Sequence, residues 1–412
     1  MKTDLVKDIF ASGKTGHVTV AGWVRTIRAS KDFGFIELND GTAQKNIQIV
    51  FDRTLDNFDI IEKQNVSACL IVEGDVVLTP EARQPLEIKA TKITVHGEST
   101  PDFPIQKKKH SFEYLRSVAH LRPRTNTFTA VFRVRSVLTY AIHRFLQENG
   151  FVYIATPCVT TSDCEGGGDV FRISTMDVNN PPRKEDGSVD WSKDFFGKQA
   201  FMTVSGQLNV EPFCWGFRKV YTFGPCFRAE NSNTPRHAAE FWQVEPEVAF
   251  ADLNDIMDII EALSKYVIKY VLDHCPDELQ FFDKFMEKGL IDKLNHTVNS
   301  DFVRIPYREA LKILNESGVK FDIPAQWGTG IQTEHEKYLA DEVFKRPVFV
   351  TDYPKECKSF YMRLNDDGET VAATDLLFPG LGEIVGSSQR EERYDVLMKR
   401  VNELGLNPDD YA

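Results

Sequence analysis

The sequence predicts an α+β protein with two domains: a five-stranded barrel, then a larger domain in which helices flank an antiparallel β-sheet. Two observations lead to this prediction. Short apolar runs separated by turn residues fill positions 18 to 96, without a long helical pattern. Further along the chain, two amphipathic helical patterns alternate with strand-like runs. A chain of 412 residues, 42% of them hydrophobic, can bury at least one large core and form two domains.

The first predicted domain, residues 1–100, contains five strand-like runs. Turn signals separate them, and we expect turns at Asn39-Asp40-Gly41 and at Glu73-Gly74-Asp75. Five strands in about 80 residues, with no long helix, are typical of the oligonucleotide-binding (OB) fold. The expected strands are VTVAGWVRTIR, FGFIELNDG, NIQIVF, ACLIVEGDVVL and LEIKATKITVH.

Residues 101–125 are predicted to form a linker or hinge, because a proline pair favours extended backbone there. The second domain, 126–412, opens with a helix from Thr127 to Asn149, whose apolar residues recur at helical spacing. A second amphipathic helix is expected from about Asp252 to His274. Strands are expected at 151–154, 200–204, 219–223 and 241–248, and a polar loop at 179–193.

Composition limits the classes of function. The formal net charge of −12 has the wrong sign for nucleic-acid binding over the whole surface, so any such contact must be local. A basic stretch from Lys107 to Arg135 is a candidate, although such stretches are more often a solvated face or a linker. With no apolar run of about 18 residues and no signal peptide, we expect a cytoplasmic protein without membrane contact. Seven scattered cysteines favour free thiols over disulfides or a zinc site.

Polar residues are concentrated in the segment from Tyr221 to Glu247, YTFGPCFRAENSNTPRHAAEFWQVEPE, where a hairpin would turn. On spacing alone, a binding site and a solvated hairpin loop are equally good interpretations. The forms FRAE and RHAAEFWQVEPE resemble motif 2 of the class II aminoacyl-tRNA synthetases, in the aspartyl, asparaginyl and lysyl subgroup. The resemblance implies that Arg228 holds the amino-acid carboxylate and the ATP α-phosphate together, which suits a planar guanidinium that can bridge two anions.

The same resemblance implies three further contacts with ATP. Glu230 accepts a hydrogen bond from the adenine amino group, and Phe241 lies under the adenine ring. His237 lies near the outer phosphates, where it offsets charge on the departing pyrophosphate; the alternative is a loop histidine without a role. The residues expected to be catalytic are Arg228, Glu230 and Glu383.

A second block implies a magnesium site. The segment TDLLFPGLGEIVGSSQREERYD, Thr374 to Asp395, resembles the subgroup's GExxGGSQRE segment. The resemblance implies that Asp375 and Glu383 bind Mg²⁺, which prefers oxygen ligands that it shares with phosphate. Glu383 is thereby also part of the expected ATP site. Ser387 replaces the family's second glycine, and it fits if the backbone torsion there is ordinary.

The amino-acid pocket is expected to bind the α-amino end of its substrate through residues of three segments. SGQLNVE, which begins at Ser205, matches the family segment in which Ser205 and Gln207 make this contact. Glu165, in a glycine-rich loop that resembles the family's closing loop, would meet the α-ammonium group. Tyr361, in YPKECKSFYMR, lines the pocket beside the substrate.

Residues at the other end of the expected pocket indicate which amino acid is the substrate. In aspartyl relatives a lysine three residues beyond the glutamine binds the substrate carboxylate, whereas this chain has Val210. Glu211 can instead accept from the side-chain amide of asparagine and repel the carboxylate of aspartate. The resemblance implies that Arg390 donates to the amide carbonyl. The alternative role for Glu211 is a salt bridge to a nearby arginine.

Motifs 1 and 3 of the family match this chain to different degrees. A helix that ends before Gly150, followed by FVYIATPCVTTSDCEGGGDVF, resembles motif 1, which implies a homodimer interface with Pro157 at its end. The glycine-rich GxGxGxER stretch of motif 3 does not occur. We therefore expect either an incomplete C-terminus or a natural fragment that binds ATP weakly.

The barrel resembles the subgroup's anticodon-binding domain, with GWVRTIRASKDFGFIELNDG matching its first hairpin. This implies that Phe35 stacks on the central anticodon uridine, with polar contacts from Arg28 and Gln48. An aromatic between basic residues suits binding of unpaired bases. The alternative is that Phe33 or Phe35 belongs to the barrel core.

Over nearly the whole chain from Val18, the resemblance implies an AMP-forming ligase that acts mainly by positioning and charge neutralisation. The expected partners are ATP, L-asparagine, tRNA(Asn) and a second copy of the chain, and the expected cofactor is Mg²⁺. Two alternatives remain. One is a non-discriminating aspartyl-tRNA synthetase, which Val210 and Glu211 oppose. The other is a catalytically silent tRNA-binding paralogue, suggested by the absent motif 3.

Overall fold

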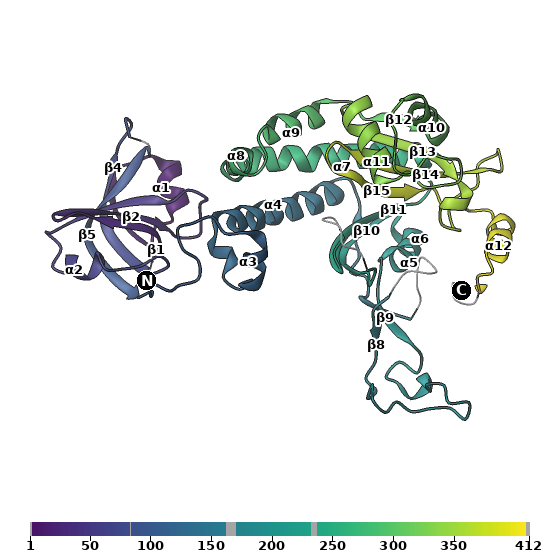
Figure 1. The fold of residues 1–412 in the computed structure, drawn as a ribbon, viewed down its shortest axis with the longest axis horizontal. Helices are drawn as coiled ribbons and strands as arrows, with labels where there is room; N and C mark the ends of the chain where they lie inside the picture. The colour runs from purple at the N-terminus through teal and green to yellow at the C-terminus, as the bar shows by residue number, and fades with distance from the viewer. Residues whose placement is uncertain (1, 83, 162–169, 232–236, 409–412) are drawn as a thin grey trace. The chain divides into compact units, whose positions relative to one another are not determined.

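The computed structural model describes residues 2–82, 84–161, 170–231 and 237–408, which form two compact units (Figure 1). The first unit contains Met1–Leu138 and Val271–Ile291, and the second contains Thr139–Tyr270 and Asp292–Ala412. The first unit therefore continues past the predicted linker into helix α4 (Asn126–Glu148). Within the described ranges, no helix has both the length and the apolar character that crossing a membrane requires.

The first unit contains the predicted closed barrel, with strand order β1-β2-β3-β5-β4. Alternation explains its core: in β3 every second residue, Ile47, Ile49 and Phe51, is buried, as expected for a sheet with one face inside. Two short helices, α1 (Val6–Ser12) and α2 (Phe58–Ile61), add apolar residues to this core. The strands are β1 (Gly16–Ala29), β2 (Phe33–Asn39), β3 (Ile47–Asp52), β4 (Cys69–Leu78) and β5 (Leu86–Gly97).

One predicted turn is wrong. Glu73-Gly74-Asp75 lies inside strand β4, where the pairing with β5 shifts register between Glu73 and Gly74. A Cβ atom at Gly74 would lie 2.3 Å from the carbonyl oxygen of Lys89. The glycine therefore permits close approach of two backbones at a β-bulge and does not reverse the chain.

Helical segments of the first unit hold the barrel at its Gly41 turn. Arg133 of α4 donates to the carbonyl oxygens of Gly41 and Thr42, the latter at 3.0 Å. Its Nε also lies 3.8 Å from Oε1 of Glu278, a buried residue of α8 (Pro276–Phe285). One guanidinium thus connects two helices to the barrel within this unit. Helix α3 (Phe112–Ser117) completes the helical part.

The second unit is built on two main sheets. One has the order β11-β10-β6 and the other the order β12-β13-β14-β15, with antiparallel pairs except β10–β6 and β12–β13. A small sheet of order β7-β9-β8 adds short strands. The strands are β6 (Val152–Tyr153), β7 (Val159–Thr160), β8 (Arg172–Ile173), β9 (Ala200–Met202), β10 (Lys219–Phe227), β11 (Glu240–Val248), β12 (Val303–Pro306), β13 (Val348–Pro354), β14 (Thr370–Phe378) and β15 (Gly382–Ser388).

The two predicted long helices are confirmed as α4 and α7 (Leu253–His274). All nine residues of β14 are buried, because apolar clusters cover both of its faces. The polar segment 179–193 contains a single bridge between Arg183 and Val189. The shorter helices are α5 (Gln207–Val210), α6 (Cys214–Phe217), α9 (Leu290–Asn299), α10 (Tyr307–Glu316), α11 (Thr333–Lys337), which continues as a π-helix (Tyr338–Val343), and α12 (Tyr394–Glu403).

Candidate active site

The hairpin of β10 and β11 carries the residues predicted to bind ATP. Cys226 pairs with Phe241 in this hairpin, and the backbone N–H of Arg228 donates to the carbonyl oxygen of Ala239 at 3.1 Å. The guanidinium carbon of Arg228 therefore lies 5.5 Å from the centre of the Phe241 ring. Glu230 and His237, which follow β10 and precede β11, are both exposed. The hairpin thus brings a cation and an aromatic face together, with an acid and an imidazole near its end.

A turn before α5 holds the residues predicted at the α-amino end of the substrate. The hydroxyl of Ser205 donates to Glu245, whose Oε2 also accepts from the backbone N–H of Gly206 at 2.9 Å. Tyr361 donates through its hydroxyl to Oε1 of Gln207 at 3.4 Å. Nε2 of Gln207 is buried and has no hydrogen-bond partner among the described residues, so this donor is available to a ligand. Predicted Glu165 lies outside the described residues.

Arg390 lies between two carboxylates. Its Nε donates to Oε2 of Glu211 at 3.2 Å, and its Nη2 donates to Oε1 of Glu247 at 2.7 Å. Nη1 donates to Oγ of Ser388 at 2.9 Å, and the guanidinium carbon lies 5.2 Å from the centre of the Tyr361 ring. Glu211 therefore forms a salt bridge with a nearby arginine, which was the alternative role considered for it. That arginine is Arg390, the residue also predicted to bind the substrate amide together with Glu211.

The electrostatics of this cluster depend on burial. Burial raises the pKa of the Glu247 carboxyl to about 7; Arg390 lowers this pKa, and Glu211 and Glu245 raise it. Burial alone would lower the pKa of Arg390, but Glu247 and Glu211 raise it above its usual value. One guanidinium thus faces two carboxylates in this cluster.

Glu247 is a further residue of this cluster that was not predicted, although the sequence contains a signal for it. Glu245 and Glu247 are two residues apart in β11, so both side chains leave the same face of the strand. Two acids on one partly buried strand face require cationic or donor partners. This pattern predicts a charged cluster, and the partner found by Glu247 is Arg390, 143 residues further along the chain.

The two predicted metal ligands lie on neighbouring strands. Asp375 of β14 pairs with Gly386 of β15, and Glu383 is three residues before that glycine. A Cβ atom at Gly386 would lie 3.2 Å from Oε1 of Glu383 and 3.5 Å from Oδ1 of Asp375. Both carboxylates therefore face a space that a side chain at Gly386 would fill. Ser387, in place of the family's glycine, has no positive φ and fits in the strand.

These carboxylates fit a magnesium ion that shares its other ligands with phosphate. The described ranges contain no group of three or more His, Cys, Asp and Glu residues that could hold a metal. Mg²⁺ often takes only one or two carboxylates from a protein and completes its shell with phosphate oxygens and water. In this structure Nζ of Lys358 lies 2.7 Å from both carboxylate oxygens of Asp375, a contact that the sequence did not suggest.

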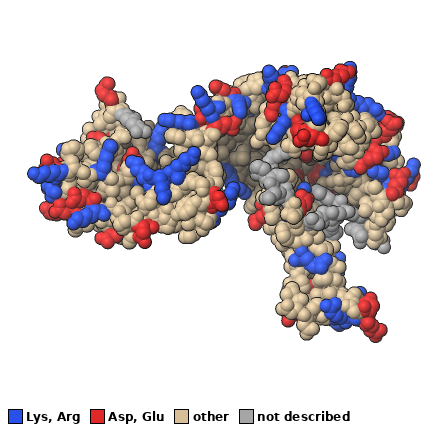
Figure 2. All heavy atoms as spheres, viewed as in Figure 1, with Lys and Arg blue, Asp and Glu red and all other residues tan. Residues whose placement is uncertain are grey.

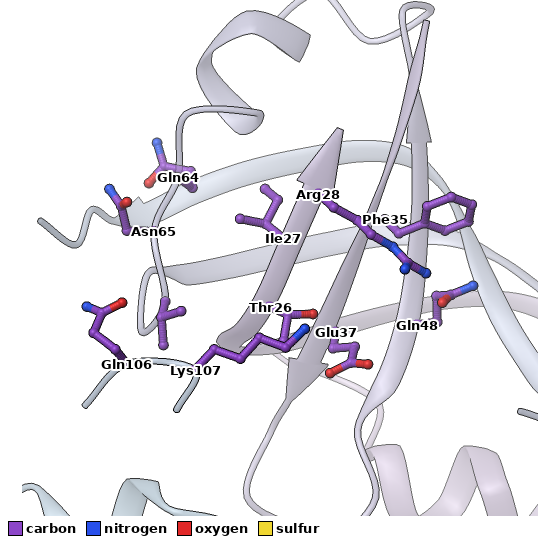
Figure 3. A pocket seen from close by; sticks show the side chains of 11 residues that line it. Thr26, Ile27, Arg28, Phe35, Glu37, Gln48, Gln64, Asn65, Gln106 and Lys107 are labelled. Carbon is purple, nitrogen blue, oxygen red and sulfur yellow. The ribbon is translucent and has the colours of Figure 1, made fainter. Parts of the chain in front are cut away.

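A separate cavity of about 240 Å³ lies on the barrel (Figure 3). The three residues predicted to contact an anticodon, Arg28, Phe35 and Gln48, all line it, and they come from β1, β2 and β3. The guanidinium carbon of Arg28 lies 5.1 Å from the centre of the Phe35 ring, and Gln48 donates to Glu87 at 2.9 Å. Phe35 is half-buried and is not among the residues of the apolar cluster in the barrel.

Charge on the barrel unit is local. Figure 2 shows groups of Lys and Arg side chains among acidic ones on this unit. Lys107, the first residue of the basic stretch, lines the barrel cavity. Basic side chains grouped locally on one unit are compatible with the net charge of −12.

Comparisons with known proteins agree with the fold. A family model described as tRNA synthetases class II (D, K and N) matches residues 111–412, and one described as an OB-fold nucleic acid binding domain matches 18–95. The asparagine–tRNA ligase of Bacillus cereus (strain ATCC 10987 / NRS 248) is 60% identical over all of this chain and 89% of its own length. That of Acetivibrio thermocellus is also 60% identical, with the same coverage.

Two solved structures are similar over the same extent. The asparaginyl-tRNA synthetase from Pyrococcus horikoshii, complexed with asparaginyl-adenylate, has a TM-score of 0.85 and 31% identity, over all of this chain and 88% of that one. The Entamoeba histolytica asparaginyl-tRNA synthetase has a TM-score of 0.81 and 27% identity, over 96% of this chain and 85% of that one.

An OB barrel followed by a two-sheet domain with a motif 2 hairpin defines a class II aminoacyl-tRNA synthetase. This chain belongs to that family, in the group of D, K and N enzymes. Within the group, the relatives described above are asparagine–tRNA ligases. The predicted family and fold class are thereby confirmed.

Proposed function

We propose that this chain is an asparagine–tRNA ligase, which activates L-asparagine with ATP and transfers it to the 3′ end of tRNA(Asn). The asparagine carboxylate attacks the α-phosphate of ATP and pyrophosphate leaves. A hydroxyl of the terminal adenosine of the tRNA then attacks the carbonyl carbon of the asparaginyl-adenylate, and AMP leaves. The observation that carries this proposal is the cluster of Glu211, Arg390 and Glu247, in a chain 60% identical to asparagine–tRNA ligases.

The cluster favours an amide over a carboxylate. Arg390 can donate to the carbonyl oxygen of the asparagine side chain, and Glu211 can accept from its NH₂ group. Aspartate would place a third carboxylate beside one guanidinium. Val210 supplies no second cation, so the carboxylate would be buried without sufficient compensation. Selectivity then follows from charge as well as from hydrogen bonding.

Activation requires two anions to meet. We assign Arg228 to the asparagine carboxylate and the α-phosphate, where its guanidinium can bridge both groups. Phe241, beside Arg228, offers a ring on which adenine can stack, and Glu230 and His237 would contact the adenine amino group and the outer phosphates. Ser205, Gln207 and Tyr361 would orient the α-amino end. This positioning lowers the barrier because the reacting groups need little reorganisation.

Mg²⁺ belongs to the proposal through Asp375 and Glu383, which would hold it beside the phosphates. Bound there, the ion would neutralise phosphate charge during displacement of pyrophosphate. The support is the pair of carboxylates that face the space above Gly386.

The barrel would bind the anticodon of tRNA(Asn) through Arg28, Phe35 and Gln48, which line one cavity. A half-buried aromatic ring beside a guanidinium suits an unpaired, splayed base. We further propose a homodimer formed through the motif 1 region, and a cytoplasmic location, where protein synthesis takes place.

The test is ATP–pyrophosphate exchange with each amino acid. We expect exchange with asparagine and none with aspartate. Comparable exchange with both would identify a non-discriminating enzyme, whereas exchange with neither, while tRNA still binds, would identify a catalytically silent paralogue. Each outcome corresponds to one of the three interpretations of the sequence.

A further inference from the structure

Lys358 is mostly buried and lies on the carboxylate proposed to bind magnesium. Its Nζ is 2.7 Å from both Oδ1 and Oδ2 of Asp375, and the two side chains are 17% and 10% exposed. The same ammonium lies 4.0 Å from the centre of the Tyr353 ring. Asp375 therefore has a cation on both of its carboxylate oxygens.

Two further acidic residues, Glu383 and Glu336, lie near the pair of Lys358 and Asp375. Glu383 shares with Asp375 the space above Gly386. Glu336 of α11 is also buried, and its Oε2 accepts from the backbone N–H of Glu383 at 3.0 Å. Lys358 thus compensates part of a concentrated negative charge that would otherwise be buried without a counter-ion.

An ammonium on both oxygens of a carboxylate opposes binding of a divalent cation to the same oxygens. The two cations repel one another, and the ammonium occupies part of the lone-pair sites of the carboxylate. A metal at Asp375 therefore competes with Lys358. Magnesium dehydrates reluctantly and is usually bound together with substrate phosphates, which supply further ligands and negative charge.

We propose that Lys358 is an internal counter-cation for Asp375, which keeps the site closed to a free divalent ion and is displaced when the metal arrives with ATP. The inference rests on the proposed magnesium site at Asp375 and Glu383. It assigns to Lys358 the role of a residue that sets metal affinity and makes metal binding depend on nucleotide. The opposing view is that Lys358 only orients Asp375 for the metal.

The experiment measures Mn²⁺ binding to the full chain by electron paramagnetic resonance of the free ion, with and without a non-hydrolysable ATP analogue. In the parent protein we expect appreciable binding only with the analogue. Lys358→Met keeps the aliphatic stem and should bind Mn²⁺ without nucleotide at least tenfold more tightly than the parent. Equal or weaker binding by Lys358→Met would overturn the proposal, because an orienting lysine predicts that result.

Two further variants control for charge and folding. Lys355→Met removes a lysine of the same segment, whose Nζ donates to the carbonyl oxygen of Gly368 at 2.9 Å, and it should bind Mn²⁺ as the parent does. Lys358→Arg restores the cation and should return metal binding to dependence on nucleotide. If Lys358→Met fails to fold, Lys358→Gln gives the same comparison with a polar neutral side chain.

Asp375→Asn separates this inference from the proposed function. With the analogue present, we expect this variant to lose Mn²⁺ binding. If it binds Mn²⁺ as tightly as the parent, the magnesium site itself is misplaced, and the role of Lys358 fails with it. If it loses binding but Lys358→Met gains none, only the role of Lys358 is wrong.

Discussion

In the proposed function, Glu211 provides selectivity through its charge, which glutamine lacks while keeping nearly the same shape. Its Oε2 accepts from Arg390 at 3.2 Å, and in the proposed function it also accepts from the substrate amide. A hydrogen bond to a charged group contributes about 1.5–3 kcal/mol, so Glu211→Gln should lower exchange with asparagine by about 10- to 150-fold. A neutral amide can also donate to a carboxylate, so exchange with aspartate should rise. An unchanged ratio between the two amino acids would contradict this role.

Glu247 should make stability depend on pH. Because burial raises its pKa from an ordinary 4.5 to about 7, the folded protein holds a proton that the unfolded chain has lost between these values. The contribution of this group to the free energy of unfolding is therefore largest below about pH 4.5 and decreases as pH rises through 7. Glu247→Gln removes that decrease. Its melting temperature, relative to the parent, should improve from pH 5 to pH 8; a constant difference would contradict the raised pKa.

Phe35 of strand β2 lines the barrel cavity. It belongs to a different domain from the hairpin that is proposed to bind ATP. Stacking of one base contributes about 1–3 kcal/mol, so Phe35→Ala should lower tRNA charging by about 5- to 150-fold and leave pyrophosphate exchange almost unchanged. Arg228→Ala should have the opposite effect, abolishing exchange while tRNA binding persists. Equal losses in both assays for Phe35→Ala would indicate a structural role.

The bulge in β4 gives a stability prediction for the barrel. A Cβ at Gly74 would lie 2.3 Å from a backbone oxygen of β5, which no rotamer change can relieve. Gly74→Ala should therefore destabilise the protein by about 1–3 kcal/mol, measured by denaturant unfolding. Gly97→Ala is the matched control, because its Cβ would meet Cys69 at an ordinary 3.7 Å. Similar losses in both variants would show that the close approach at Gly74 is unimportant.

Element positions could be predicted from the sequence, because period-2 and helical patterns depend on neighbours along the chain. The barrel strands and the helices α4 and α7 were found in this way. The turn at Gly74 was misjudged, because a glycine at a bulge and one in a turn look alike until the partner strand is known. The contacts of Arg390 with Glu247 and of Lys358 with Asp375 join residues 143 and 17 positions apart. Such pairings depend on packing of separate elements, which no local pattern contains.

At the scale of the whole molecule, the proposed homodimer gives a mass prediction. Light scattering should find twice 46.9 kDa. Val152 is 37% exposed on β6, which ends the order β11-β10-β6 and belongs to the motif 1 region. Val152→Lys should shift the mass towards a single chain, since like charges at an interface cost several kcal/mol. Val178→Lys, at a position 86% exposed in a polar loop, should leave the mass unchanged.

Strand β14, with all nine residues buried between two apolar clusters, should also limit local unfolding of the second unit. Its amide protons can exchange with deuterium only when the sheet around them comes apart, so they should be among the slowest in the chain. Asp375 belongs to this strand, whereas Glu230 and His237 are exposed at the end of a hairpin. We therefore expect the proposed metal carboxylate to lie in the part of the second unit that opens least often, whereas Glu230 and His237 lie at exposed positions.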